Sequence, residues 1–237
     1  MCRYAAGLLA LLLVTPQAWS NTTLRYSGVA RAGGQVAYVE DHTVEYADSG
    51  RLLTARTVYR SEAGRPIAEM RSDFRDSLTV PAHVIQDFRT GNVQGLRREA
   101  GRVVLFDQDR GQPERTRVLN DADAVEHILV GCQGLNYYLL DNLDRLSPGQ
   151  VVPLRFLIPG KLDYYDFQMR RVQTSGPQIT EFEITIKSRF LKLFAPKLVI
   201  RYDRQLKRIV WYEGLSNIRN DAGHNQSVTI TYGDTPK

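Results

Sequence analysis

The stretch that most constrains the fold is residues 179–214, where apolar and polar side chains alternate along three successive segments. Side chains of a β-strand point to opposite faces with a period of two, so each alternating segment predicts a strand with one apolar face. The third segment is 208–212, and the apolar positions of the first two are Phe182, Ile184, Ile186, Leu198, Ile200 and Tyr202. The stretch therefore predicts an antiparallel meander whose apolar face must be buried against another layer.

The amino terminus has the pattern of a secretory signal peptide over residues 1–20. Arg3 precedes an apolar run at 5–14, and the small residues Ala18 and Ser20 fit a cleavage site after residue 20. The apolar run has about ten residues, whereas a membrane-spanning helix needs roughly 20. We therefore expect cleavage of this segment rather than a membrane anchor. The mature chain is expected to be periplasmic and soluble, with no transmembrane segment.

The cysteines and the charge point to the same compartment. Cys2 lies ahead of the apolar run, so it cannot be the lipid-attached cysteine of a bacterial lipoprotein, and Cys132 alone remains after cleavage. An intramolecular disulfide is then excluded, which favours a bacterial periplasmic protein over a secreted eukaryotic domain. The formal net charge of +5 comes from dispersed residues, and the longest basic runs are pairs such as Lys207-Arg208. The sequence therefore predicts no nucleic-acid partner; a solvated surface, or else contact with anionic lipid, accounts for the basic residues.

Residues 24–106 have the pattern of strands separated by turns. The turns recur every eight to twelve residues or so, which is typical of an antiparallel sandwich or barrel. Asp48-Ser49-Gly50 is one such signal, because glycine tolerates the positive backbone angle of a tight hairpin. No repeat, low-complexity tract or linker divides the chain. Residues 21–237 are therefore predicted to form a single β-rich domain.

One segment has helical periodicity. It follows a polar stretch at 107–118, predicted to be a loop, and Asn120 or Asp121 can cap it. Gly131 and Gly134 weaken its middle, so a kink or two shorter helices is the alternative. Apolar residues recur at intervals of three and four at Val125, Ile128, Leu129, Cys132, Leu135, Tyr138, Leu139 and Leu143. The predicted fold class is mainly β (α+β): a curved antiparallel sheet or half-open barrel, with one main helix covering its concave apolar face.

Residue types that commonly carry catalysis or bind metals are scattered. The histidines at 42, 83, 127 and 224 show no metal-ligand spacing. Glu126-His127, with two aspartates a turn earlier, forms an acid–imidazole cluster on the predicted helix, where first-turn carboxylates also complement the helix dipole. We predict that His42 makes a surface or cross-strand contact and that Cys132 is a small buried hydrophobe. No catalytic, metal-binding or cofactor-binding residue is assigned, and the chain is predicted to be non-enzymatic.

Aromatic side chains are concentrated in the second half of the chain. Their ordinary role is to fill a core, and the functional alternative is to line a cavity between the curved sheet and the helix. Segment 190–196 is apolar on both alternating faces apart from Lys192, which fits a rim, a lid or a partner contact. The candidate ligand-binding residues are Tyr138, Tyr164, Phe167, Phe190, Phe194 and Trp211.

The tail at 189–217, RFLKLFAPKLVIRYDRQLKRIVWYEGLSN, is similar to the end of uncharacterised periplasmic domain-of-unknown-function families. In those families an apolar segment ending in Ala-Pro precedes two strands joined by a polar turn. The overall plan resembles the periplasmic half-barrel proteins, whose characterised members are the lipoprotein-localisation factors LolA and LolB. The resemblance implies a sheet wrapped around a hydrophobic interior and a non-enzymatic binding role, and it carries over no functional residue. The chain departs from those factors in having one predicted helix where they use several, so the resemblance does not imply a lipoprotein as cargo.

Three functions follow from these observations. The first is a periplasmic protein that binds an apolar or lipid-like ligand between sheet and helix, with a role in envelope biogenesis. The alternative is a structural or protein-interaction module of the cell envelope with a fully packed core, whose partner contacts 190–196 or a strand edge. The third is a hydrolase without a recognisable motif, built around His127. A cavity favours the first, an exposed apolar patch the second, and a converging histidine–carboxylate pair in a cleft the third.

Overall fold

The computed structural model describes residues 22–120, 127–172, 174, 176–188 and 197–234. The predicted signal peptide and the candidates Phe190 and Phe194 lie outside these residues, so the structure says nothing of them. Within the described residues, fifteen strands belong to one sheet, and one α-helix accompanies them. The chain is thus mainly β with a single helix, as the sequence predicted.

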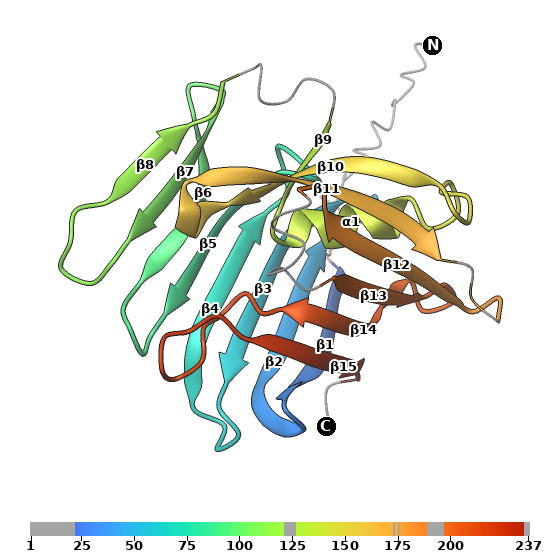
Figure 1. The fold of residues 1–237 in the computed structure, drawn as a ribbon, viewed down its shortest axis with the longest axis horizontal. Helices are drawn as coiled ribbons and strands as arrows, with labels where there is room; N and C mark the ends of the chain where they lie inside the picture. The colour runs from blue at the N-terminus through green and yellow to red at the C-terminus, as the bar shows by residue number, and fades with distance from the viewer. Residues whose placement is uncertain (1–21, 121–126, 173, 175, 189–196, 235–237) are drawn as a thin grey trace, which may run out of the picture.

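The amino-terminal arm of the sheet is a run of antiparallel hairpins (Figure 1). Each strand pairs with the next along the chain, because turns and alternating side chains follow one another as the sequence predicted. Its members are β1 (Thr22–Ala32), β2 (Gln35–Tyr46), β3 (Leu52–Arg60), β4 (Pro66–Asp73), β5 (Ala82–Asp87), β6 (Val93–Glu99), β7 (Arg102–Gln108) and β8 (Arg115–Val118).

The carboxy-terminal arm returns from the opposite edge towards the middle. It contains the predicted meander, as β12, β13 and β14 in order. Helix α1 (Gln133–Asp141) lies in the connection between its first two strands, β9 and β10, which run parallel. The strands of this arm are β9 (Ile128–Gly131), β10 (Val151–Ile158), β11 (Asp163–Val172), β12 (Ile179–Ile186), β13 (Leu198–Asp203), β14 (Arg208–Leu215) and β15 (Ser227–Gly233).

The first and last strands meet in the middle of the sheet. β15 pairs with β1 antiparallel, so the order runs β8 to β1 and then β15 back to β9. The chain therefore starts at the centre, extends to one edge, crosses to the other and returns (Figure 1). This topology gathers β1, β2, β3, β14 and β15, which come from both ends of the sequence, into one central region.

The two arms curve towards one another without closing a barrel. Within the described residues no strand pairing joins β8 to β9. The 3-10 turn η2 (Pro159–Lys161) nevertheless contacts β6 and β7, and Arg117 of β8 forms an ion pair with Asp163 of β11. An apolar cluster fills the junction between the arms with Val80, Leu96, Leu105, Leu119 and Leu157. The arms are joined by the β1–β15 ladder in the middle of the sheet, and side chains hold their outer parts together.

Helix α1 packs into the largest apolar cluster of the molecule. The Tyr137 ring meets the Phe74 ring edge to face at 4.8 Å between centroids, and the Tyr202 hydroxyl donates to Asn136 Oδ1 at 2.9 Å. Leu135 and Leu139 are buried in the same cluster, which joins residues of both arms. Burial of several large side chains at about 1.5–3 kcal/mol each is what fixes so short a helix.

Two sequence predictions of secondary structure are wrong. The helix expected to follow a cap at Asn120 or Asp121 begins, within the described residues, only at Gln133, because residues 128–131 pair with β10 as the edge strand β9. The backbone of Cys132 ends that strand with a φ of 31°. The stretch at 107–118, expected to be a loop, instead holds the end of β7 and the whole of β8. Apolar residues at Ile128, Leu129 and Val130 satisfy a short strand as well as a helical stripe, which is why the period misled.

Gly134, expected to weaken a helix, allows a close approach instead. A Cβ atom at this position would lie 1.9 Å from the carbonyl oxygen of Thr79. The neighbouring Gly131 N–H donates to the same oxygen at 2.8 Å. The glycines therefore let the β9–α1 connection rest directly on the segment between β4 and β5.

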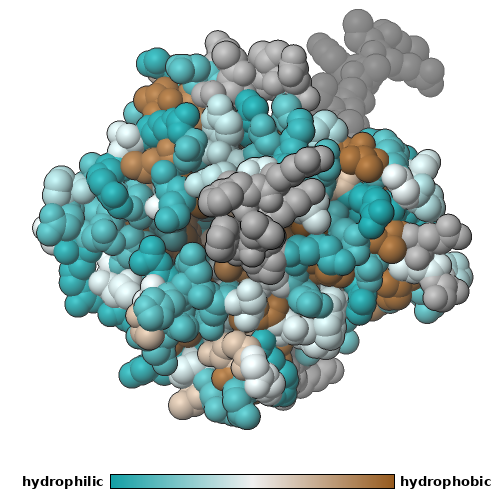
Figure 2. Space-filling view, viewed as in Figure 1, coloured by the Kyte–Doolittle hydropathy of each residue, from teal (hydrophilic) through white to brown (hydrophobic). Residues whose placement is uncertain are grey.

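The outward face of the sheet carries cross-strand ion pairs. Glu183 of β12 lies between Arg170 and Lys197, and Glu69 of β4 lies between Arg56 and Arg71. Exposed pairs of this kind contribute little to stability, about 0–1 kcal/mol each. On the face shown in Figure 2, hydrophilic residues cover most of the surface and hydrophobic ones form small separate groups. Among the described residues, no helix has the length and apolar character needed to span a bilayer.

Candidate functional site

A cavity of about 120 Å³ lies between the first turn of α1 and the centre of the sheet. Its apolar wall comes from side chains such as Leu135, Ile200, Ile209 and Ile230. Polar and aromatic side chains of both arms form the rest, namely Tyr26, Tyr38, Glu40, His42, Tyr59, Cys132, Gln133, Asn136, Tyr137, Phe156, Tyr202, Tyr212, Ser216, Asn217 and Tyr232. An apolar pocket with a few convergent polar groups is the usual form of a small-molecule site.

The period of two along β2 places its polar residues in this cavity. Tyr38, Glu40 and His42 occupy alternate positions, so all three point to the inner face. Tyr232 of β15 approaches the same region across β1, where Gly28 leaves room for its ring. A Cβ atom at Gly28 would lie 2.7 Å from that ring. The absence of a side chain at Gly28 is therefore what brings Tyr232 close to Glu40.

A chain of hydrogen bonds runs along the cavity wall. Gln133 Nε2 donates to Thr57 Oγ1 at 3.0 Å, and Thr57 Oγ1 lies 3.0 Å from His42 Nδ1. His42 Nε2 lies 2.9 Å from Glu40 Oε2, and the Tyr232 hydroxyl donates to the same carboxylate oxygen at 3.1 Å. The His42 ring also stacks on Tyr26 at 4.4 Å between centroids. The histidine is thus held from both edges and one face.

The directions of these bonds assign a proton to His42. The Thr57 hydroxyl has His42 Nδ1 as its hydrogen-bond acceptor among the described residues, so its proton points to that nitrogen. Nδ1 then accepts, and the ring proton sits on Nε2 and points to Glu40. With Gln133 Nε2 as the donor to Thr57, a second proton on Nδ1 would leave the buried Thr57 hydroxyl without an acceptor. The network is therefore complete with a neutral imidazole.

Glu40 is a buried acid whose partners carry no fixed positive charge. Its residue is 4% exposed, and within the described residues His42 is its one ion-pair partner. Its second oxygen, Oε1, accepts no hydrogen bond from any described residue. Both hydrogen bonds to Glu40 from described residues converge on Oε2, from the His42 ring and the Tyr232 hydroxyl. With a neutral His42, the site holds one uncompensated negative charge.

This carboxylate influences the surrounding hydroxyl and thiol groups. Burial raises the pKa of each of these groups, and the negative charge of Glu40 raises it further. The groups are Tyr26, Tyr38, Tyr59, Cys132, Tyr212 and Tyr232. All of them therefore stay protonated, and the tyrosines present neutral rings to the cavity.

Cys132 shares the cavity wall without the properties of a nucleophile. Its thiol donates to the sulfur of Met70 at 3.2 Å. Burial raises the pKa of this thiol to about 12, with the charge of Glu40 acting in the same direction. Thiolate chemistry requires a lowered pKa, so Cys132 behaves as the packed hydrophobe that the sequence predicted.

The segment after β14 forms the outer wall and the mouth of the cavity. Ser216 Oγ lies 2.8 Å from the Tyr38 hydroxyl, and Asn217 Nδ2 lies 3.5 Å from that of Tyr59. Leu215 is 42% exposed and Asn217 is also exposed, although both line the cavity. The cavity therefore opens to solvent beside Leu215 and Asn217.

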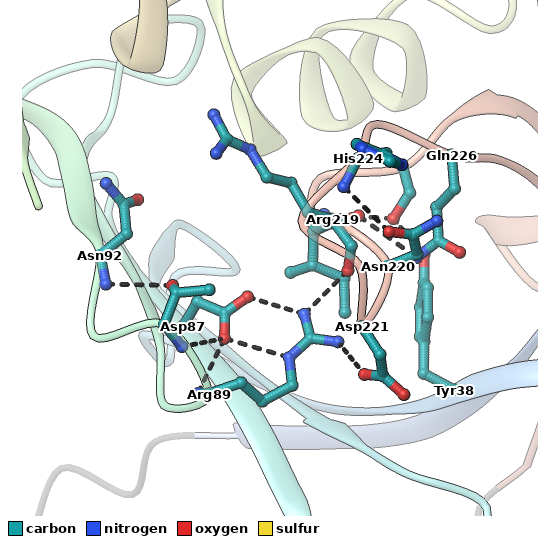
Figure 3. A network of polar contacts seen from close by, with 12 residues as sticks. Tyr38, Asp87, Arg89, Asn92, Arg219, Asn220, Asp221, His224 and Gln226 are labelled. Atoms are coloured by element: carbon teal, nitrogen blue, oxygen red, sulfur yellow. Dashed lines mark hydrogen bonds and ion pairs between the residues drawn. The ribbon is translucent and has the colours of Figure 1, made fainter.

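A single arginine fixes this outer wall to the other arm. Arg89, at the β5–β6 turn, forms ion pairs with Asp87 of its own turn and Asp221 of the β14–β15 loop. Its guanidinium also donates to the Arg219 carbonyl at 2.8 Å (Figure 3). The loop is closed within itself, since Asn220 Oδ1 accepts the His224 N–H at 2.9 Å. The wall is therefore anchored at both Tyr38 and Arg89.

The aromatic residues predicted to bind a ligand lie elsewhere. Tyr138 packs from α1 against the main apolar cluster, and Tyr164 lies between the guanidinium groups of Arg117 and Arg155. The Phe167 ring meets Phe156, and Trp211 lies under the guanidinium of Arg201. None of these four is among the residues that line the cavity. Their role in binding remains a prediction.

The residues that define the site were not selected from the sequence. His42 makes the cross-strand contacts that were expected, with Tyr26 and Thr57, and it also lies in the cavity wall, which was not expected. A signal was present, because Tyr38, Glu40, His42 and Val44 share one alternating face, and two ionisable residues interrupt an otherwise apolar series. A charge on the inward face of a strand indicates a built polar site, since burying it unpaired is costly.

The acid–imidazole cluster expected around His127 lies only in part within the described residues. His127 precedes β9 and lies outside the helix, and its predicted partner Glu126 lies outside the described residues. Asp163 and Asp166 pair with different arginines, Arg117 and Arg155. Within the described residues, no group of three or more histidine, cysteine, aspartate and glutamate side chains is arranged to hold a metal ion.

Comparison with known proteins adds no relative. No protein-family model, no curated protein and no solved structure matches the chain.

Proposed function

We propose that the chain is an exported, non-enzymatic binding protein of the cell envelope, which holds an apolar or lipid-like ligand between the sheet and α1. The observation that carries the proposal is the cavity at this position, with apolar walls and a small set of converging polar groups. In this proposal α1 covers the concave face of the sheet, and the ligand occupies the space that the helix leaves. The periplasm as compartment rests on the signal-like segment 1–20 and the lone Cys132 in the remainder.

The volume limits how much of a ligand is enclosed. The cavity measures about 120 Å³, whereas drug-sized ligands occupy pockets of roughly 300–1,000 Å³. An apolar cavity of about 150 Å³ holds one benzene molecule. The cavity therefore accommodates one ring, one head group or a short alkyl segment. The remainder of a larger ligand extends through the mouth beside Leu215 and Asn217.

A hydrolase is a weaker reading, although one arrangement favours it. Thr57, His42 and Glu40 form a hydroxyl–imidazole–carboxylate series, which is the order used for an activated nucleophile. Thr57 is 0% exposed, however, and is not among the residues that line the cavity. A substrate in the cavity does not reach its hydroxyl. The series instead orients His42 and holds Glu40 in place.

A purely structural role has less support from the described surface. The large hydrophobic residues exposed there are Phe88, Val118, Val151, Leu206 and Leu215, which lie on separate elements of the chain. The edge strand β8 has the sequence RTRV and four residues, and short charged edges resist pairing with other chains.

The experiment that tests the proposal compares two core variants by native mass spectrometry. Protein purified from the periplasm is measured intact, and bound compounds are extracted into solvent and identified. Ile200→Phe adds a ring to the cavity wall, so we expect the fold to be retained and the co-purifying compound to be lost. Ile184→Phe, in the packed core of the neighbouring β12, is the matched control and should cost about 1–3 kcal/mol of stability.

Either outcome is informative. A compound that co-purifies with the unmodified chain and disappears in Ile200→Phe supports a binding function at this cavity. An unliganded mass that persists after incubation with envelope lipids overturns it and favours the interaction module.

A further inference from the structure

We propose that the cavity selects a cationic amine, with the Glu40 carboxylate as counter-ion and the tyrosine rings around it as the wall of the amine site. The inference rests on the proposed binding function and goes beyond it by naming the charge and chemical class of the group that enters. It follows from the partners of four side chains: Glu40, His42, Thr57 and Gln133.

The first argument is the missing cation. A buried carboxylate is costly unless it is paired, and protein cores normally pair it with arginine or lysine. Glu40 is buried, and no arginine or lysine among the described residues forms an ion pair with it. The charge of His42 does not replace one, because Thr57 donates to its Nδ1 and the ring is neutral in the complete network. A ligand cation supplies what the protein lacks.

The second argument is the surplus of acceptors. Glu40 Oε1 has no donor among the described residues, and Gln133 Oε1 is buried without a hydrogen-bond partner although its residue lines the cavity. A primary ammonium has three donors and no acceptor, which matches such a site. An alcohol or a carboxylic acid offers at most one donor. The unpartnered acceptor atoms, Glu40 Oε1 and Gln133 Oε1, therefore favour an amine over a neutral polar head group.

The third argument is the aromatic wall. Tyr26, Tyr38, Tyr59, Tyr212 and Tyr232 line the cavity around Glu40. Neutral tyrosine rings attract cations through their faces, and the effect is larger where water is excluded. The mouth is rimmed by Leu215 and Asn217, neither of which carries a positive charge that would repel an incoming amine. The site thus combines one anion with several weakly attractive faces.

The size fits the head group rather than a whole lipid. A cavity of about 120 Å³ has room for an ammonium with a short alkyl chain. The same chemistry is presented by a free alkylamine and by the ethanolamine head group of a phospholipid. The ammonium group of either source would bind in the same way. The two differ in the part of the molecule that extends outside the mouth of the cavity.

The test is isothermal titration calorimetry with n-butylammonium and, as its neutral counterpart of similar shape, 1-butanol. We expect n-butylammonium to bind and 1-butanol to bind roughly tenfold more weakly or worse, because the ion pair is lost. Glu40→Gln keeps the shape of the side chain and removes its charge, so it should reduce the affinity for n-butylammonium about tenfold or more while leaving that for 1-butanol unchanged.

Asp41→Asn is the matched control. Asp41 is the next residue of β2, faces outward and pairs with Arg60. The Asp41→Asn substitution removes one negative charge from the same strand as Glu40→Gln does, so a general effect of net charge would appear in both variants. We expect its affinity for n-butylammonium to stay within about twofold of the unmodified chain, since exposed charges are largely screened. Circular dichroism of both variants checks that they fold.

The outcomes separate the two proposals. Equal binding of 1-butanol and n-butylammonium, with no effect of Glu40→Gln, overturns the amine inference and leaves the binding function standing. Binding of neither probe overturns both. Displacement of n-butylammonium by potassium chloride at equal concentration also overturns the inference, because the site would then be a simple cation site.

The source of the amine is read from vesicles. Sedimentation with vesicles of phosphatidylethanolamine, but not with vesicles of phosphatidylglycerol, together with loss in Glu40→Gln, supports a lipid head group. Binding of n-butylammonium without sedimentation supports a free amine. Sedimentation with both lipids that persists in Glu40→Gln counts against the inference, since the membrane then recognises another part of the chain.

Discussion

Glu40 and Asp107 are buried to the same extent, each 4% exposed, and differ in their partners. Asp107, on β7, accepts hydrogen bonds from Arg115 and from Asn92 Nδ2 at 3.0 Å. Glu40, on β2, meets a tyrosine hydroxyl and a neutral imidazole. The first acid is balanced by the fold itself, whereas the second is left with its charge facing a cavity. Partners, rather than burial, therefore distinguish a structural acid from a candidate site.

Differences in partners also separate other polar residues of the described chain. His42 is hydrogen-bonded at both nitrogens, whereas His83 on β5 has one long contact, 3.4 Å from Nδ1 to the Pro81 carbonyl. Thr57 is bonded on both sides, whereas the equally buried Thr180 hydroxyl has no partner among the described residues. Histidine and threonine thus each occur once with hydrogen bonds on both sides and once with a long contact or without a partner among the described residues. Matched mutations can test whether connection is what matters.

The largest expected effect comes from acid acting on His83. Burial lowers the pKa of His83 from 6.5 to about 4. Between these values the unfolded chain binds a proton that the folded chain excludes, so stability falls as the pH falls from 6.5 to 4. The pKa difference corresponds to a loss of about 3 kcal/mol. Chemical denaturation at several pH values across this window measures it.

His83→Leu is the variant that isolates this effect. It removes the titrating group, so the slope of stability against pH between 6.5 and 4 should flatten. Carboxylates with lowered pKa values, such as Glu183 beside Lys197 and Arg170, lose their contribution at lower pH, as they become protonated. An unchanged slope in His83→Leu would show that another group causes the acid sensitivity.

The next effect concerns the two threonines. Thr57→Val removes the hydroxyl and leaves His42 Nδ1 and Gln133 Nε2 without their partner, for an expected loss of about 2 kcal/mol. Thr180→Val removes a hydroxyl that is 1% exposed and has no partner among the described residues, so stability should be unchanged or higher. Urea denaturation of the two variants gives both numbers. Equal losses would mean that the hydrogen-bonded chain adds nothing to packing.

A smaller effect separates the two acids. Asp107→Asn leaves Arg115 and Asn92 with an uncharged acceptor and should reduce stability by about 1 kcal/mol. Glu40→Gln removes a buried charge that has no fixed counter-ion, so stability should be unchanged or slightly higher. Thermal denaturation in the absence of added amine compares them. A large loss in Glu40→Gln would show that Glu40 is needed for the fold and would remove the contrast.

Much of the fold is readable in the sequence, because strands and turns are local features. The alternation of Phe182, Ile184 and Ile186 led directly to β12, with those three side chains buried. The helix was misplaced because the β9 residues pair with β10, from which they are separated by α1, and no local pattern reports such a contact. At residues 128–131 the long-range pairing with β10 produces a strand, although the spacing of the apolar residues is also compatible with a helix.

The site was harder to predict than the fold. Glu40 and Tyr232 are at opposite ends of the described chain and meet because β15 pairs with β1. Gly28 permits their contact because it has no side chain to block the Tyr232 ring. Amino-acid composition does not reveal such a steric role. The aromatic residues chosen from the sequence are real features of the second half, but Tyr164 and Trp211 face arginines instead of the cavity. The cavity around Glu40 is instead indicated by a charge on an inward position of a strand.

The last prediction changes no stability and bears directly on the contrast between the histidines. Because Thr57 donates to Nδ1, His42 should be a neutral imidazole with its proton on Nε2, as read from the ¹⁵N chemical shifts of its ring. The Nε2–H form should persist in Thr180→Val, and in Thr57→Val the preference for it should weaken, since Nδ1 loses its donor. A doubly protonated ring in the unmodified chain would place a positive charge 2.9 Å from Glu40, balance that acid internally and remove the reason for a cationic ligand. The state of one imidazole therefore decides whether the cavity resembles the region of Asp107, balanced by its own residues, or is a site that awaits a partner.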